Sequence, residues 1–243
     1  MQHKPERMAV VTGGSRGIGL ATVARLAGDG FAVAACSRHS SPDLDRLIEE
    51  NPDIRFFRLD LAEAISVKEC ATELHRQYDR IDALVNCAGT AAGGLFSLTR
   101  MEDMKRVFDI NYFHTILFTQ YLAKKMVRAK AGAIVNIVST AGLLSDAGTL
   151  SYGGSKAALI HATKVMAVEL GAFGIRVNAI APAVVETDMA ALMDEKARAA
   201  LDGRSALKGT VDASDIANMV SFLASEQARN VTGQIVRVDR GLH

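Results

Sequence analysis

The sequence predicts an α/β protein in which a parallel sheet is covered by helices on both faces. Three observations support this prediction. Short apolar runs alternate with longer helical patterns almost to the end of the chain, and a glycine-rich turn directly follows the first run. The prolines all fall outside the predicted helix interiors: Pro5, Pro42, Pro52 and Pro182. Strand–helix alternation implies right-handed crossovers and therefore a doubly wound sheet.

Each apolar run is typical of a strand that is buried on both faces. We expect strands at 8–11, 31–36, 54–59, 81–85, 133–138, 175–180 and 234–238. Apolar residues recur at helical spacing between the runs. We expect helices near 17–28, 43–50, 63–78, 102–129, 152–172 and 212–225. No linker divides the chain, so we expect one domain over residues 1–243.

Residues 187–210 interrupt this rhythm. A helical stretch at 189–201 is followed by Gly203 and Gly209. Because the segment comes after the sixth strand, it is a candidate flap over a site.

Composition excludes several classes of function. Hydrophobic residues make up 49% of the 243, which supports a sizeable core, and the net charge of +1 leaves no basic footprint for nucleic acid. The apolar runs are shorter than the ~20 residues of a membrane helix. The start of the chain lacks the apolar segment of a signal peptide, and the three cysteines and six histidines have no metal-ligand spacing. We therefore expect a cytoplasmic protein with reduced thiols, no bound metal and no membrane or nucleic-acid partner.

The glycine-rich turn is a candidate dinucleotide site. Gly13, Gly14, Gly17 and Gly19 lie between the first strand and a helix that begins near Ile18. Glycines let the backbone approach a pyrophosphate closely, and a helix N-terminus offers free N–H groups. The position of the turn in the first strand–helix unit strengthens this interpretation. The alternative is a tight turn that binds no ligand.

The end of the second strand indicates which dinucleotide is preferred. An acidic residue there would bond the ribose hydroxyls of NAD, but this chain has Ser37 and Arg38. A hydroxyl and a guanidinium suit the 2′-phosphate of NADP, so we predict NADP(H) as the cofactor. Arg16 is expected to stack on the adenine or to reach the same phosphate. A merely solvated Arg38 is the alternative.

Two further strand ends belong to this side of the site. Asp60 ends the third strand, where it would either accept a hydrogen bond from the adenine amino group or cap the next helix. The fourth strand ends in Asn86, Cys87, Ala88 and Gly89, whose small residues would let adenosine lie against the chain.

A second group of residues indicates acid–base chemistry. Tyr152 and Lys156 are one helical turn apart and share a face. A nearby ammonium favours phenolate over a phenol of pKa ~10, and a fall of about 3 units corresponds to roughly 4 kcal/mol. We therefore predict a lowered pKa for Tyr152 and a role as proton donor to a developing alkoxide. Ser139, after the fifth strand, would polarise the substrate carbonyl. Asn111 is expected to kink a helix and hold a water behind the lysine.

Each of these residues alone has an ordinary structural explanation, but their order behind a dinucleotide turn indicates carbonyl/alcohol redox chemistry. The motifs resemble those of the short-chain dehydrogenase/reductase family over nearly the full chain. They are Thr12-Gly13-x-x-x-Gly17-x-Gly19, Asp60-Leu61, Asn86-x-Ala88-Gly89, Asn111, Ser139, Tyr152-x-x-x-Lys156, Asn178 and Pro182 to Thr187.

The resemblance implies one Rossmann-like domain with seven parallel strands in the order 3-2-1-4-5-6-7. It also implies a catalytic tetrad of Asn111, Ser139, Tyr152 and Lys156. The residues and the resemblance together predict a set of cofactor contacts. These are Thr12, Gly13, Ser15, Arg16, Gly17, Ile18, Gly19, Ser37, Arg38, Asp60, Leu61, Asn86, Ala88, Gly89, Tyr152, Lys156, Pro182, Val184, Val185 and Thr187.

Within the family, the chain is most similar to 3-oxoacyl-(acyl-carrier-protein) reductases. It departs from the usual pattern at Cys87, at Ala183 and at Arg240, where asparagine, glycine and glycine are usual. Reductases of this kind tend to carry two basic docking positions beside the site. Lys130 matches one of these positions, but Phe173 stands at the other.

The residues expected on the substrate side are small or apolar, and no arginine or carboxylate clearly stands ready for a charged substrate. They comprise Ala91, Ala92, Gly93, Gly94, Ser139, Ala141, Leu143, Leu144, Val184, Met189 and Met193. The helices at 102–129 and 152–172 carry extra apolar surface, and the resemblance implies a homotetramer, or a homodimer, built on them. Arg237 and Arg240 would lie at the second contact of a tetramer.

The leading hypothesis is NADPH-dependent reduction of a ketone, namely a 3-oxoacyl thioester linked to acyl carrier protein or to coenzyme A. The alternative of the same class is an enzyme for another apolar ketone/alcohol pair in secondary metabolism or catabolism. A different class remains open, a catalytically silent NADP-binding sensor or scaffold, although a scaffold has no need of Tyr152 with Lys156.

Overall fold

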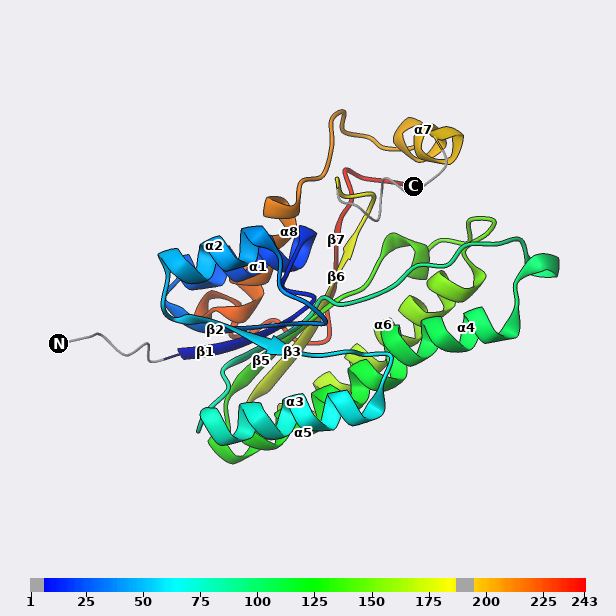
Figure 1. Ribbon diagram of the computed structural model, residues 1–243. Helices are drawn as coiled ribbons and strands as arrows, with labels where there is room; N and C mark the ends of the chain where they lie inside the picture. The colour runs from blue at the N-terminus through cyan, green and yellow to red at the C-terminus, as the bar shows by residue number, and fades with distance from the viewer. Residues whose placement is uncertain (1–6, 187–194) are drawn as a thin grey trace.

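The computed structural model describes residues 7–186 and 195–243. Its strands form one parallel sheet in the predicted order β3-β2-β1-β4-β5-β6-β7 (Figure 1). They are β1 (Arg7–Thr12), β2 (Phe31–Ser37), β3 (Ile54–Arg58), β4 (Ala83–Asn86), β5 (Gly132–Ile137), β6 (Ile175–Pro182) and β7 (Ile235–Val238).

Helices connect the strands and cover both faces of the sheet. The α-helices are α1 (Gly17–Gly28), α2 (Pro42–Glu50), α3 (Ala64–Gln77), α4 (Met101–Phe108), α5 (His114–Ala129), α6 (Leu150–Gly171), α7 (Glu195–Gly203) and α8 (Ala213–Ala224). Short 3₁₀ turns are η1 (Phe96–Leu98), η3 (Thr140–Gly142) and η5 (Glu226–Ala228), and η2 (Asp109–Phe113) is a π-helix.

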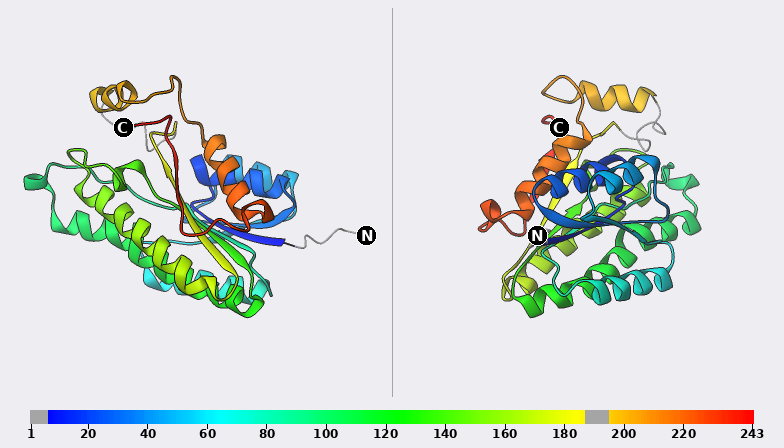
Figure 2. Two further views of the ribbon diagram at one scale, coloured as in Figure 1. Left: turned by 180° about the vertical axis from the view of Figure 1, so that it is seen from behind. Right: turned by 60° about the vertical axis from the view of Figure 1, so that its left-hand side comes forward.

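Alternate residues of the first strand enter different cores, which explains its continuously apolar sequence. Met8 and Val10 belong to the core under α3 and α5, whereas Ala9 and Val11 belong to the core under α1 and α8. The views in Figure 2 show the same two helical layers around the sheet. Burial on both faces is therefore what the apolar runs encode.

The predicted long helix at 102–129 is interrupted. It is divided into α4, the π-helix Asp109–Phe113 and α5. Apolar spacing continues across the interruption, so periodicity alone does not reveal it. A kink was expected at Asn111, and at this position the structure has a π-helix that interrupts the α-helix.

The register of the strands brings the loops of interest together. Thr12 is paired with Cys36 and with Asn86, and Asn86 is paired with Asn136. The carboxyl ends of β1, β2, β4 and β5 therefore lie at one edge, where ligands bind in open α/β sheets. Among the helices of the described residues, none has the length and apolar character to cross a membrane.

Candidate active site

The turn after β1 is shaped by close backbone packing. The N–H groups of Gly13 and Gly14 both donate to the carbonyl of Cys36, at 2.7 and 3.2 Å. A Cβ on Gly19 would lie 2.0 Å from the carbonyl oxygen of Gly13, and one on Gly13 would lie 3.0 Å from the backbone of Ala88. The backbone is consequently bare where α1 begins, as a pyrophosphate requires.

Two of the predicted cofactor residues, Thr12 and Asn86, have side chains that form hydrogen bonds within the protein. The hydroxyl of Thr12 accepts hydrogen bonds from the N–H groups of Cys87 and Ala88, both at 3.0 Å. The amide of Asn86 is buried and donates to Thr119 at 2.9 Å and to Asn136 at 2.8 Å. These side chains tie β1 to the end of β4 and β4 to β5. Because the side chain of Asn86 points into the core, its expected cofactor contact, which stays a prediction, would be made by the backbone.

The end of β2 carries the residues predicted to select the dinucleotide. Arg38 is exposed, and Ser37 is half-buried with its hydroxyl donating to the carbonyl of His39 at 2.8 Å. The hydroxyl of Ser41 donates to the carbonyl of Ser15 at 2.6 Å, which joins the start of α2 to the glycine-rich turn. Arg16 is the N-cap residue of α1. The side chains predicted to bind the phosphate, those of Arg16, Ser37 and Arg38, thus flank the glycine-rich turn.

Asp60 forms local hydrogen bonds, but it does not cap the next helix, because the N-cap residue of α3 is Glu63 and α3 has no side-chain cap bond. One carboxylate oxygen of Asp60 accepts from the N–H of Ala62 at 2.9 Å, and its own N–H donates to Ser66 at 2.9 Å. These bonds turn the chain into α3. Leu61 is buried, and its carbonyl contacts a ring nitrogen of His114. Asp60 remains half-exposed, so contact with a nucleotide base is still sterically open.

Lys156 is the central charged group of the catalytic side. Its side chain is buried, and Nζ donates to the carbonyl of Ile137 at 2.8 Å. Nζ lies 5.8 Å from the ring centroid of Tyr152, which stands one turn earlier on α6. The two side chains therefore face each other, as their spacing predicted.

Ser139 lies at the same edge, immediately after β5. It is the N-cap residue of η3, and its hydroxyl accepts from the N–H of Ala141 at 3.1 Å. Its hydroxyl also lies close enough to the phenol of Tyr152 to act on the pKa of that group. The structure thus brings together Ser139, Tyr152 and Lys156 from one strand end and one helix.

Asn111 supports this group from the π-helix. Its amide oxygen accepts from the N–H of Thr90, and its amide nitrogen donates to the carbonyl of Thr90, both at 2.8 Å. The same nitrogen donates to Ser155 at 3.0 Å. The predicted bond to a water behind the lysine competes with these protein partners. Asn111 therefore acts in this structure as a link between the chain after β4 and α6.

Sequence reasoning did not single out Ser155. Its hydroxyl is fully buried, accepts from Asn111 and donates to the carbonyl of Tyr152 at 2.7 Å. The available signal was a small polar residue next to Lys156 in a helix whose other face is apolar. Gly89 has a related role, because a Cβ there would lie 3.2 Å from Asn111 Oδ1 and 3.4 Å from Lys156 Nζ.

Burial dominates the protonation of the site. It lowers the pKa of Lys156 to about 8. It raises the pKa of Tyr152, and the nearby hydroxyl of Ser139 opposes that rise. The prediction of a lowered Tyr152 pKa is therefore wrong for this structure, because loss of water outweighs favourable contacts. Burial also raises the pKa of Cys87 to about 12, so its thiol stays protonated near Lys156.

The predicted substrate side is partly described. Thr187, Met189 and Met193 lie outside the described residues. Pro182 and Val185 are buried at the end of β6, Val184 is half-buried, and Leu143 is 43% exposed. The predicted flap begins outside the described residues and continues as α7.

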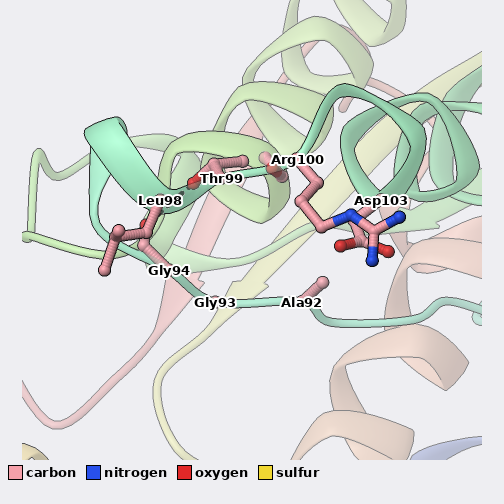
Figure 3. A pocket seen from close by; sticks show the side chains of 8 residues that line it. Ala92, Gly93, Gly94, Leu98, Thr99, Arg100 and Asp103 are labelled. Atoms are coloured by element: carbon pink, nitrogen blue, oxygen red, sulfur yellow. Dashed lines mark hydrogen bonds between the residues drawn. The ribbon is translucent and has the colours of Figure 1, made fainter.

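A hollow lies between the chain after β4 and the start of α4 (Figure 3). Ala92, Gly93 and Gly94 form one wall, and Ser151, the neighbour of Tyr152, also lines it. The side chains of Arg100 and Asp103 extend toward one another at one end. Ser139, Tyr152 and Lys156 do not line this hollow, so the expected small and apolar lining of the substrate side stays a prediction.

Comparisons with known proteins agree with this geometry. A family profile described as "Enoyl-(Acyl carrier protein) reductase" matches residues 13–243. A relative from Thermotoga maritima, named "3-oxoacyl-[acyl-carrier-protein] reductase FabG", is 34% identical over 240 residues, which cover 97% of each chain. One of the same name from Staphylococcus epidermidis is 33% identical and covers 98% of this chain and 99% of its own.

Solved structures show the same fold. A short-chain type dehydrogenase/reductase from Mycobacterium ulcerans superposes with a TM-score of 0.90 at 29% identity, covering 98% of this chain and 90% of the other. The structure described as "ElxO with NADP Bound" gives 0.88 at 28% identity, with 97% and 98% covered.

The fold and the site define an oxidoreductase that uses a nicotinamide cofactor. The chain belongs to the short-chain dehydrogenase/reductase family.

Proposed function

We propose that this protein reduces the keto group of a 3-oxoacyl thioester to a secondary alcohol, with NADPH as the reductant. The observation that carries the proposal is the convergence of Ser139, Tyr152 and Lys156 at one strand edge. The names of the Thermotoga and Staphylococcus relatives describe this reaction.

The residues present fit a dinucleotide. The turn at Gly13 and Gly19 has no room for side chains, so its backbone is open to a pyrophosphate at the start of α1. Arg38, which is exposed, and Ser37 would bind a 2′-phosphate in this proposal, and this supports NADP over NAD. The solved relative ElxO is described with NADP bound. When bound, NADPH supplies a hydride.

Tyr152 is the proton donor in this proposal. Its raised pKa keeps the phenol protonated at neutral pH, which is the form that reduction needs. In the reduction, the proton would pass from the phenol oxygen of Tyr152 to the keto oxygen and leave a phenolate. The Ser139 hydroxyl hydrogen-bonds the same oxygen and stabilises the charge that develops on it.

Lys156 stabilises the phenolate that remains. With a pKa of about 8 it is mostly charged at neutral pH, and its Nζ lies 5.8 Å from the Tyr152 ring. The bond to Ile137 holds this ammonium against β5. Ser155 and Asn111 fix the turn of α6 between Tyr152 and Lys156.

A ketone is favoured over a carbon–carbon double bond, although the family profile is described as an enoyl reductase. Reduction of a ketone places the proton on oxygen, whereas reduction of a double bond places it on carbon. The hydroxyl of Ser139 acts on the phenol of Tyr152 and lowers its pKa, which supports two hydroxyl groups directed at one acceptor position. That arrangement is suited to an oxygen atom.

Two residues, Lys130 and Phe173, bear on which carrier holds the acyl group. Lys130 is the C-cap residue of α5, and its carbonyl lies 2.6 Å from where a Cβ of Gly174 would be. Lys130 and Phe173 therefore lie near the amino ends of β5 and β6. Within one chain this is the sheet edge opposite to Tyr152, so the expectation that they lie beside the site is wrong for a single chain.

We also propose that the protein assembles through α5 and α6. Large apolar side chains stay exposed beside and along these helices, with Phe113 at 54% and Val168 at 82%. A four-helix interface between two copies would cover them. The guanidinium of Arg237 pairs with Asp239 of its own chain, which leaves it less available for the predicted second contact of a tetramer.

The test is NADPH oxidation with matched substrates. The panel contains a 3-oxoacyl thioester of coenzyme A, the same acyl group on acyl carrier protein, the corresponding 2-enoyl thioester and an apolar ketone without a thioester. Turnover of the 3-oxoacyl thioesters, lost in Tyr152→Phe, is the expected result.

Other outcomes would redirect the assignment. Turnover of the enoyl thioester alone would overturn the proposal in favour of double-bond reduction. Turnover of the simple ketone alone would point to another ketone/alcohol pair. Tight NADPH binding without turnover of any substrate would identify a sensor or scaffold.

A further inference from the structure

The C-terminal residues 239–243 lie beside the segment that follows α7, and Figures 1 and 2 show the C-terminus close to α7 in each view. Arg240 has φ +58°, a left-handed conformation. Left-handed backbone costs a residue other than glycine roughly 1–2 kcal/mol. A glycine would avoid this cost, so we expect the side-chain contacts of Arg240 to offset it.

The side chain of Arg240 spans a loop. One nitrogen of its guanidinium pairs with Asp202 at 2.5 Å, and the other donates to the carbonyl of Gly209. The backbone carbonyl of Arg240 accepts from the N–H of Leu207 at 2.9 Å. The side chain is only 12% exposed. Arg240 therefore joins both ends of the segment 202–209 to the C-terminal residues.

Arg204 extends this set of contacts to the catalytic side. It donates to the carbonyl of His243 at 2.7 Å and pairs with Asp146 at 2.7 Å. Asp146 lies in the loop that joins Ser139 to Tyr152. Its carbonyl accepts from the hydroxyl of Thr149 at 2.6 Å.

That loop leads directly into the catalytic helix. The carbonyl of Thr149 accepts from the N–H of Gly153 at 2.6 Å, in the first turn of α6 and next to Tyr152. Arg240 is therefore linked to the start of α6 by contacts and by short stretches of backbone. It pairs with Asp202, which lies two positions before Arg204 in the chain, and Arg204 pairs with Asp146.

The free energies typical of such ion pairs indicate whether these contacts stabilise the whole fold or hold one segment in position. An exposed ion pair contributes only about 0–1 kcal/mol to folding, and the Arg204–Asp146 pair is 38% and 34% exposed. Its removal should therefore have little effect on global stability. Its effect on the position of a surface segment is larger, because such segments open locally at low free energy.

We propose that Arg240 and Arg204 are positioning residues, which hold the segment 202–209 against the loop 143–150 and so set the affinity for the ketone substrate. The inference rests on the proposed reductase function. Neither residue contacts the reacting groups, so the proton transfer itself does not depend on them.

The experiment compares Arg240→Gly, Asp146→Asn and their double variant with the wild type. Glycine keeps the left-handed backbone and removes only the side-chain contacts. We expect KM for the 3-oxoacyl thioester to rise about five- to tenfold, with kcat and NADPH affinity changed less than about twofold. Amide hydrogen exchange in 202–209 should become faster.

Two further variants serve as controls. Arg240→Lys keeps a charge for Asp202 and should restore part of the substrate affinity. Arg46→Ala removes an exposed arginine that pairs with Asp43 at 3.7 Å on α2. It should leave KM and hydrogen exchange unchanged.

The outcomes separate this inference from the proposed function. A wild-type protein that reduces 3-oxoacyl thioesters, with the same KM in Arg240→Gly and Asp146→Asn, would overturn the inference alone. A wild type without such activity would overturn the proposed function. In that case unchanged exchange at 202–209 in Arg240→Gly would overturn the contact network as well.

Discussion

The turn after β1 and the loop after β5 lie at the same sheet edge, but the turn is shaped by backbone packing and the loop acts through side chains. At Gly13 and Gly19 the backbone itself fills the space, and a single added carbon would lie 2.0 Å from a carbonyl oxygen. After β5, the proposed chemistry depends on the side chains of Ser139, Tyr152 and Lys156, and burial changes the pKa values of Tyr152 and Lys156.

This difference determines which substitutions each region tolerates. A region defined by backbone packing is sensitive to volume and insensitive to pH. A region defined by buried ionisable groups is sensitive to the loss of one polar atom and to pH, even where shape is preserved. Four predictions test this contrast, from the largest expected effect to the smallest.

Tyr152→Phe removes one oxygen and leaves the ring. We expect kcat for ketone reduction to fall about 10³-fold, because positioned general acids contribute roughly 10²–10⁴-fold. NADPH affinity, measured by fluorescence titration, should stay within about twofold. A variant that keeps more than a tenth of the wild-type rate would exclude Tyr152 as the acid.

The stability of the cofactor-free protein should depend on pH through Lys156. Its pKa is about 8 when folded and 10.5 as the ordinary value, so the unfolded chain binds more protons between these limits. The contribution of Lys156 to stability therefore rises as pH rises from 8 to 10.5, by up to about 3 kcal/mol.

The measurement is urea unfolding of the wild type and of Lys156→Met across this pH range. The unfolding free energy of the wild type minus that of Lys156→Met should increase as pH rises. A constant difference would contradict burial as the cause of the lowered pKa.

Gly19→Ala tests the backbone-defined region with one methyl group. Because the new Cβ would overlap the Gly13 carbonyl, we expect a loss of about 1–3 kcal/mol of stability and weaker NADPH binding. Gly28→Ala is the matched control at the end of the same helix, where a Cβ meets no atom within 4 Å. That variant should be neutral or more stable by up to about 1 kcal/mol. Equal effects of the two substitutions would show that steric packing at Gly19 is unimportant.

Arg38→Asp tests cofactor choice at the edge of the same region. We expect the ratio of kcat/KM for NADPH to that for NADH to fall by at least about tenfold, which corresponds to 1.4 kcal/mol. Arg46→Asp, on the neighbouring helix α2, should leave this ratio unchanged. A preference that does not shift in Arg38→Asp would reject Arg38 as the phosphate ligand.

The sequence predicted the strand order through the family resemblance and the strands themselves through apolar runs. The glycine-rich turn after β1 was predictable because steric rules allow only glycine at particular positions of such a turn. The facing of Tyr152 and Lys156 was predictable because helical periodicity fixes it.

What the sequence did not reveal depends on the three-dimensional surroundings of single groups. The direction of the Tyr152 pKa shift follows from how much water burial removes, which spacing does not encode. The inward orientation of Asn86 depends on partners in β5 and α5 that are remote in sequence. The intrachain role of Arg240 depends on a loop that ends 31 positions earlier, at Gly209.

The π-helix at Asp109–Phe113 constrains how this chain can change length. It accommodates one residue more in its hydrogen-bonded turn than an ordinary helix. Deleting one residue there would restore an ordinary turn and keep the buried faces of α4 and α5, but Asn111 would lose the position from which it bonds Thr90 and Ser155. A deletion at the start of α5 would instead rotate the following side chains by about 100° and take Phe118 and Leu122 out of the core. We therefore expect length changes to be tolerated in the exposed residues 95–98 and rejected at the start of α5.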